Sequence, residues 1–111
     1  MKAMVLKKIS SLDENEEPLE LVDLPDPVPG DKEILVRVST CGVCHTELDE
    51  IEGRTPPPRF PVVLGHQVVG RVERLGSEAR QFKVGDRVGI AWIYSACGKC
   101  EFCREDNENL C

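Results

Sequence analysis

Apolar and polar residues alternate along short stretches of this chain, which is the pattern of half-buried β-strands. The alternation is clearest over residues 33–39 and 87–93. The apolar faces of these two stretches are formed by Ile34, Val36, Val38, Val88, Ile90 and Trp92. Large apolar residues on one strand face are most simply explained as packing residues, so we assign Trp92 to the core.

Three further stretches favour strands but are interrupted or closed by glycine or proline. These stretches are residues 2–6, 19–24 and 62–75. Gly65 and Gly70 fall inside the last stretch, which predicts bends or bulges there. Residues 25–30 alternate proline with other residues and end in glycine, so we expect an extended connection followed by a turn.

One short helix is predicted at residues 46–53. Thr46 and Asp49 have the spacing of a capping box, and Gly53 can end the helix. Many short strands, frequent turns and a single short helix together indicate a mainly β fold, either a barrel or a sandwich.

Composition narrows the class of protein. The 111 residues fit one domain, and 41% apolar with 31% charged residues is typical of a globular protein rather than a disordered one. The net charge of −6 argues against nucleic acid or an anionic membrane as partner. No apolar run approaches the ~20 residues that span a bilayer, and the first residues do not form a signal peptide. Six cysteines without a secretory leader favour a reducing compartment, so we expect a cytoplasmic protein.

The strongest chemical signal is a cysteine run of the form C-x2-C-x2-C-x7-C near the end of the chain. It consists of Cys97, Cys100, Cys103 and Cys111. Thiols this close can converge on one tetrahedral ion, whereas a disulfide between residues three apart is strained. The alternatives are a structural thiol cluster and an iron–sulfur site, although bacterial ferredoxins continue the same spacing with x3-Cys-Pro rather than a gap of seven.

A second set of candidate ligands lies in two shorter motifs. Cys41-Gly42-Val43-Cys44-His45-Thr46-Glu47 covers residues 41–47, and Gly65-His66-Gln67 opens a predicted strand. Loops at strand ends are frequent locations of binding sites. Taken alone, Cys44 is more simply a buried thiol, Thr46 a helix cap and His45 a solvated side chain. Cys41 is expected to pack as a buried thiol.

These motifs resemble the amino-terminal part of the zinc-dependent alcohol dehydrogenases of the medium-chain dehydrogenase/reductase superfamily. The resemblance rests on residues 41–47, on the glycines around His66, on Gly85-Asp86-Arg87-Val88 and on the four-cysteine run. It covers most of the chain from Pro27 onward. It implies a GroES-like β-barrel over residues 1–111 with a zinc-binding lobe at residues 97–111. The chain contains no G-x-G-x-x-G turn, so we expect the dinucleotide-binding (Rossmann) domain to be absent from it.

The resemblance also implies roles for individual residues. Cys44 and His66 match two ligands of a catalytic zinc whose third protein ligand lies beyond residue 111, and the four late cysteines match a structural zinc. Three protein ligands leave one position for substrate, whereas four thiolates leave none. Thr46 matches the hydroxyl that begins the proton relay, and His45 matches a contact to the cofactor pyrophosphate.

Two residues depart from the family pattern near the expected zinc. Gln67 stands where the family has Glu, which removes a negative charge, and we hypothesise a more electrophilic zinc. Glu47 stands where the family has Asp, and we expect it to orient the imidazole of His66 in the same way. Asp49 stands where many relatives have the last histidine of the relay.

The resulting functional hypothesis is a fragment of an enzyme that interconverts alcohols and aldehydes or ketones. Zinc would polarise the alcohol, and NAD or NADP would exchange hydride with it. By resemblance the full-length protein would be a dimer or tetramer, and this fragment alone would be inactive. The alternative is a non-enzymatic, zinc-stabilised GroES-like β-barrel module.

Overall fold

The computed structural model describes residues 1–93 and 95–111 of the chain. Its strands and helices are β1 Lys2–Leu6, β2 Leu19–Asp23, β3 Ile34–Gly42, α1 His45–Glu52, β4 Gln67–Leu75, β5 Arg87–Ile90, α2 Glu101–Arg104 and the 3₁₀ turn η1 Glu108–Leu110. The predicted mainly β class is confirmed. The two helical segments of the cysteine run are too short to leave a periodic pattern in the sequence, and they were not predicted.

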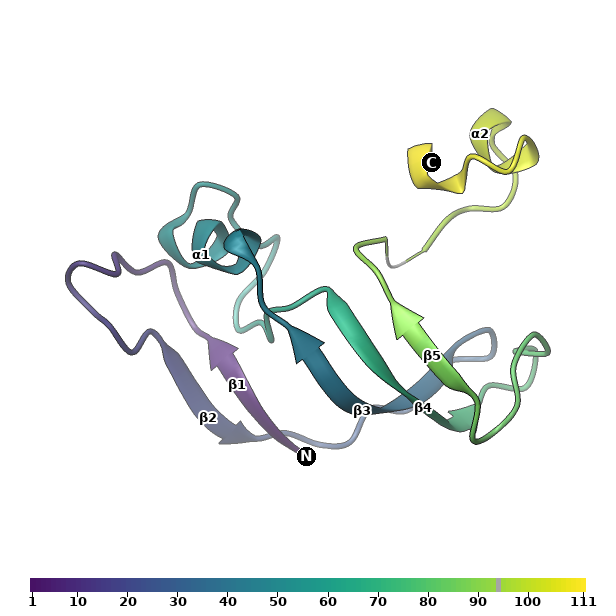
Figure 1. The fold of residues 1–111 in the computed structure, drawn as a ribbon, viewed down its shortest axis with the longest axis horizontal. Helices are drawn as coiled ribbons and strands as arrows, with labels where there is room; N and C mark the ends of the chain where they lie inside the picture. The colour runs from purple at the N-terminus through teal and green to yellow at the C-terminus, as the bar shows by residue number, and fades with distance from the viewer. Residues whose placement is uncertain (94) are drawn as a thin grey trace.

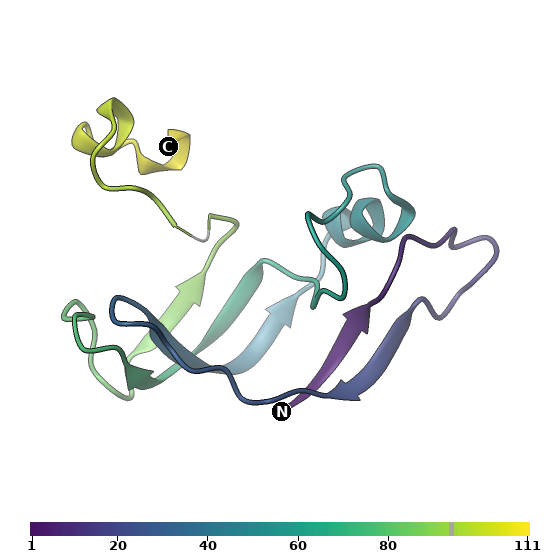
Figure 2. The same cartoon turned by 180° about the vertical axis from the view of Figure 1, so that it is seen from behind.

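The strands form two antiparallel sheets. β1 pairs with β2, and β3, β4 and β5 form a three-stranded sheet in that order. Figure 1 shows the two sheets side by side, with α1 at one end of them and α2 beyond the end of β5. An isolated bridge links β1 to the segment between α1 and β4, where Leu6 and Val62 exchange backbone hydrogen bonds of 2.8 and 3.0 Å. Among the described residues the strand pairings do not close into a complete barrel, as the reverse view in Figure 2 also shows.

Glycine decides where the long predicted strand at residues 62–75 begins. Gly65 has a φ of +115°, a backbone conformation that other residues rarely adopt, and β4 starts two residues later at Gln67. Gly70 lies inside β4, opposite Val38, next to a register shift in β3. The predicted bends or bulges at these glycines thus correspond to a bend at Gly65 and to a register shift opposite Gly70, whose extra residue lies in β3.

The N-cap of helix α1 lies two residues earlier than the cap predicted at Thr46. The N-cap residue is Cys44, and the carboxylate of Glu47 accepts a hydrogen bond from the Cys44 N–H, so the predicted Thr46–Asp49 capping box is wrong. The sequence offers the same spacing at both pairs, and only Glu47 is buried, which explains why its carboxylate is the one that turns back to the backbone. Gly53 ends the helix in the left-handed conformation as predicted.

The core of the described residues is small. Its buried apolar side chains are Ala3, Val5, Leu6, Ile51 and Val72. Helix α1 is attached to this core through Ile51, whose carbonyl accepts a 2.9 Å hydrogen bond from the Ser10 N–H just after β1. Trp92 does not belong to it: β5 ends at Ile90 and the Trp92 side chain is 58% exposed, so the core assignment is wrong.

Replacement of Leu6 by Ala should destabilise the protein by about 2–5 kcal/mol, because Leu6 is fully buried and the change leaves a cavity. Leu21→Ala in the neighbouring strand is the control, since Leu21 is 60% exposed and its loss should change stability by less than about 0.5 kcal/mol. Urea denaturation monitored by circular dichroism measures both. Equal losses for the two variants would contradict the position of the core.

Candidate metal centres

Two segments far apart in the sequence meet at one end of the β3–β4 pair. The register places Gly42 opposite Gln67, so the chain leaving β3 lies beside the chain entering β4. Cys44 follows β3 by two residues, and His66 immediately precedes β4. The sheet register therefore brings a thiol and an imidazole together, as the two motifs suggested.

The distance between the two side chains suits a metal ion. Cys44 Sγ lies 3.5 Å from Nε2 of His66, and both side chains are half-buried. With Zn–S near 2.3 Å and Zn–N near 2.05 Å, two ligands of a tetrahedral zinc are about 3.6 Å apart. The pair thus has the donor atoms and the spacing of two zinc ligands without any movement of the chain.

Glu47 holds both of these residues. Its side chain is only 5% exposed, its Oε2 accepts a 2.6 Å hydrogen bond from the Cys44 N–H, and its Oε1 lies 3.0 Å from His66 Nδ1. Nδ1 and Nε2 point away from opposite sides of the ring, so Glu47 contacts the imidazole on the side away from Cys44. Glu47 therefore fits an orienting carboxylate behind the ligand rather than a ligand itself.

The charge of Glu47 is stabilised in this position. Burial opposes the charged form, but hydrogen bonds from the backbone of Cys44 and of Glu47 itself outweigh burial and hold the pKa of Glu47 below its usual value. Among the described residues, Oε1 accepts no hydrogen bond of good geometry, although Nδ1 is within 3.0 Å. An anionic oxygen at this distance favours the tautomer with hydrogen on Nδ1, which leaves the Nε2 lone pair free for a metal.

A cleft of about 550 Å³ opens beside His66. Its lining is mostly apolar and consists of His66, Gln67, Val68, Val69, Gly89, Ile90, Ala91 and Trp92. The Trp92 ring meets the His66 ring in a T-shaped contact, with centroids 4.7 Å apart. Sequence reasoning missed this role for Trp92, because alternation along a strand cannot distinguish a core face from a cleft wall.

The remaining predicted site residues lie around this cluster without joining it. Thr46 is half-buried in the first turn of α1, and its hydroxyl has no hydrogen-bond partner in the part of the chain that the structure describes. His45 is exposed beside Asp49. Gln67 lies over Gly42, where an added Cβ would meet its Oε1 at 2.7 Å. Cys41 is exposed rather than buried, which corrects its assignment as a packed thiol.

The four late cysteines form a second, separate cluster. Cys103 Sγ lies 3.5 Å from Cys100 Sγ and 3.9 Å from Cys97 Sγ, close to the edge of about 3.8 Å between two thiolates on one zinc. Each of the four sulfurs lies within 4.8 Å of the others. The cluster closes through the Cys97 N–H, which points to Cys111 Sγ at 3.4 Å. Four sulfurs fill a tetrahedral shell, so this lobe fits a closed metal site.

Protonation within the lobe is uneven. Backbone N–H groups of Lys99 and Cys100 donate to the Cys97 sulfur and lower the pKa of Cys97 to about 6. Desolvation, with the Cys100 thiol beside it, raises the pKa of Cys103 to about 12. Several thiolates cannot share so small a volume without a cation, which is the electrostatic reason why this donor set suits a divalent ion.

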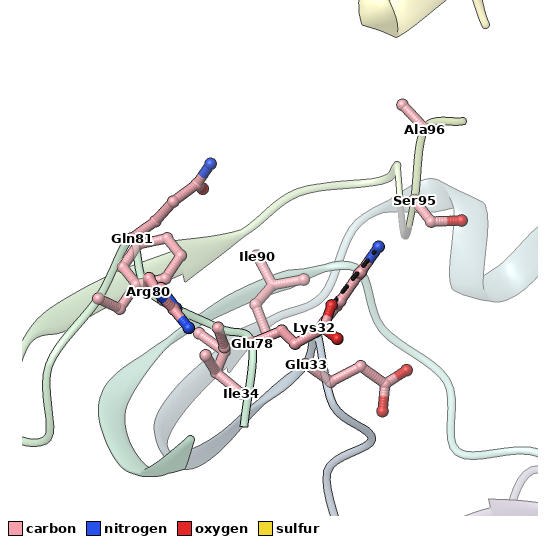
Figure 3. A pocket seen from close by; sticks show the side chains of 11 residues that line it. Lys32, Glu33, Ile34, Glu78, Arg80, Gln81, Ile90, Ser95 and Ala96 are labelled. Atoms are coloured by element: carbon pink, nitrogen blue, oxygen red, sulfur yellow. Dashed lines mark ion pairs between the residues drawn. The ribbon is translucent and has the colours of Figure 1, made fainter. Parts of the chain in front are cut away.

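A larger hollow, of about 1000 Å³, lies elsewhere and contains none of the candidate ligands. Figure 3 shows its rim, where Lys32 Nζ pairs with Glu78 at 3.7 Å. Apolar side chains such as Ile34, Phe82 and Ile90 form part of its wall. The larger volume of this hollow therefore does not make it the functional site. The smaller cleft beside His66 is the better candidate for a substrate-binding site, because a candidate metal ligand lines it.

The fold and the two clusters define a mainly β domain with two groups of side chains that could hold a metal ion. Residues 30–111 match the family model described as the alcohol dehydrogenase GroES-like domain, and the chain belongs to that family.

Proteins with assigned names are similar to this chain over most of its length. It is 42% identical over 105 residues to an alcohol dehydrogenase of Geobacillus stearothermophilus, covering 94% of this chain and 31% of that protein. It is 48% identical over 99 residues to a Mycobacterium tuberculosis protein named "Probable alcohol dehydrogenase AdhA", covering 85% and 29%. A crystal structure of an NAD-dependent alcohol dehydrogenase superposes with a TM-score of 0.83 at 33% identity, covering 100% of this chain and 31% of that one.

The chain thus spans about 31% of the length of such relatives. Their names do not favour the alternative of a non-enzymatic module. Within residues 1–93 and 95–111, none of the helices has the length and apolar character that a membrane crossing requires.

Replacement of Glu47 by Gln should lower metal affinity at Cys44 and His66 by about 10- to 100-fold. The amide oxygen can still cap α1, but its NH₂ group then faces Nδ1 and forces hydrogen onto Nε2, the nitrogen beside Cys44. Zinc titration and zinc content measure the effect. Glu52→Gln on the same helix is the control, and unchanged zinc binding in Glu47→Gln would contradict the orienting role.

Zinc affinity of the four-cysteine lobe should rise steeply between pH 6 and pH 8. Cys103, with a pKa of about 12, is protonated throughout this range and must release its proton when metal binds. Cys97, with a pKa of about 6, has already lost its proton over most of this range before metal binds. Competition with a coloured chelator, in a His66→Ala background that leaves only the lobe, measures this dependence. An affinity independent of pH would show that the lobe does not bind through thiolates.

Proposed function

We propose that the protein carrying this chain is a zinc-dependent oxidoreductase that interconverts an alcohol and an aldehyde or ketone, with NAD or NADP as hydride acceptor or donor. The observation that carries the proposal is the convergence of Cys44 Sγ and His66 Nε2, 3.5 Å apart, at the mouth of an apolar cleft. Family membership and the names of the relatives support it, and one similar structure is described as NAD-dependent.

The open cluster supplies the reaction centre in this proposal. Cys44 and His66 would hold a zinc ion together with a third ligand from outside this chain, and a bound zinc supplies Lewis-acid polarisation of the substrate oxygen. Glu47 keeps the Nε2 lone pair of His66 directed toward the site. Trp92 forms a wall of the cleft, where its ring packs against the imidazole of His66.

Proton transfer and cofactor binding involve the first turn of α1. The Thr46 hydroxyl, with no partner among the described residues, is available to accept the proton of the substrate hydroxyl while it passes its own proton outward to solvent. His45 is exposed at the start of the helix and would contact the cofactor pyrophosphate. Gln67 borders the cleft as a neutral side chain, and its lack of charge would leave a bound zinc more electrophilic than a glutamate would.

The lobe at residues 97–111 would hold a second zinc with a structural role, because its four sulfurs leave no position for substrate. We further propose that residues 1–111 are part of the catalytic domain, with the dinucleotide-binding domain outside them. A cytoplasmic homo-oligomer, a dimer or a tetramer, would be the functional form.

The test is an assay of the full-length protein and of residues 1–111 with primary and secondary alcohols and either NAD or NADP. The full-length protein should reduce the dinucleotide, lose activity on chelation and regain it with zinc, whereas the 111-residue chain alone should be inactive. Thr46→Ala should lower kcat about 10²- to 10⁴-fold without loss of zinc. Thr40→Ala, on the exposed part of β3, is the control. Full activity after complete removal of zinc would overturn the proposal.

A further inference from the structure

Helix α1 carries several carboxylates, which would repel a phosphate group bound beside it. Its eight residues include Glu47, Asp49, Glu50 and Glu52. Asp49 is the one nearest to His45 in the described contacts, with its Oδ1 3.7 Å from the imidazole Nε2. A pyrophosphate that approaches His45 therefore also approaches the carboxylate of Asp49. Like charges at this range repel unless a cation intervenes.

Arg54 is that cation. Gly53 turns the chain back at the end of α1 with a φ of +78°, and the Arg54 guanidinium returns along the helix. Its Nε donates to Oδ1 of Asp49, the same oxygen that faces His45, and its Nη1 donates to Oε2 of Glu52. Among the described residues, Arg54 is the only arginine or lysine in contact with a carboxylate of α1.

The side chains concerned remain accessible from solvent. His45 is 77% exposed, Arg54 52% and Asp49 29%. The cluster is therefore open to a ligand on the outer side of α1, while Glu47 on the inner side serves the metal ligands. One short helix thus presents two separate electrostatic environments, a buried carboxylate on one side and a compensated carboxylate on the other.

We infer that Arg54 is a positioning residue for the dinucleotide: by neutralising Asp49 and fixing its carboxylate beside His45, it allows the exposed end of α1 to accept the cofactor pyrophosphate. The inference rests on the proposed function, since it deepens the cofactor role of His45. Arg54 acts through Asp49 and not as a phosphate ligand, because two of its nitrogens are already engaged on carboxylates.

The experiment measures the dissociation constants of NADH and NADPH for the full-length protein by fluorescence titration. Arg54→Ala should weaken binding of the preferred dinucleotide about two- to five-fold at low salt, the size expected for an exposed charge pair. The difference from wild type should shrink at ~1 M salt, where the Debye length is about 3 Å. Zinc content and melting temperature should stay unchanged.

Two further variants make the test specific. Arg37→Ala removes an exposed arginine that pairs with Glu73 at 2.7 Å on the β3–β4 sheet, so it matches the charge change and should leave binding unaltered. Asp49→Asn in the Arg54→Ala background removes the repelling charge and should restore most of the lost affinity. Weak binding that persists in this double variant would overturn the action through Asp49.

The outcomes also separate this inference from the proposed function. Equal binding by wild type and Arg54→Ala would overturn the role of Arg54 and leave the dehydrogenase assignment intact. A wild-type protein that binds neither NADH nor NADPH would overturn both. A loss in Arg54→Ala that is matched by Arg37→Ala would show a general charge effect and would also refute the inference.

Discussion

The local structure around Cys44 and His66 depends on one buried carboxylate. Glu47 caps the first turn of α1 through the Cys44 N–H and contacts His66 Nδ1 with its other oxygen. A single charged group thereby fixes a helix start, the sulfur that follows β3 and the ring that precedes β4. Burying a charge is unfavourable unless it is hydrogen-bonded, and these contacts are the compensation. Because both candidate ligands share this partner, the geometry between them is largely set before any ion arrives.

The two clusters bring their candidate ligands together in opposite ways. In the open cluster, a thiol and an imidazole come from strand ends that are far apart in sequence, so the sheet register sets their spacing. In the lobe, all four sulfurs come from a segment of fifteen residues, and local turns of the chain set their spacing. The open arrangement leaves room for a fourth partner beside an apolar cleft, whereas the sulfur shell of the lobe is complete. The first arrangement is therefore suited to a substrate, and the second to holding a short segment of chain together.

Much of this could be predicted from the sequence, because strand alternation, glycine positions and cysteine spacing are local signals. The extent of β1, the break at Gly65 and the end of α1 at Gly53 follow from such signals. The start of α1 did not, since two possible capping pairs are present and the contact of Glu47 with a distant ring distinguishes them. The prediction that Trp92 lies in the core was wrong for a similar reason. Its ring contacts His66, a residue distant in sequence, and alternation within one strand carries no information about such a contact.

The bridge between Leu6 and Val62 has a consequence for how the molecule opens. In the described residues, this pair of backbone hydrogen bonds is the only strand pairing between the β1–β2 hairpin and the rest of the fold. Units joined through so few ladder contacts tend to behave as separate foldons. The side chains of β1 oppose this separation, because Val5 and Leu6 share one buried core with Ile51 of α1 and Val72 of β4. The more exposed strand β2 should therefore open first, and amide exchange would be graded from β2 inward rather than all-or-none.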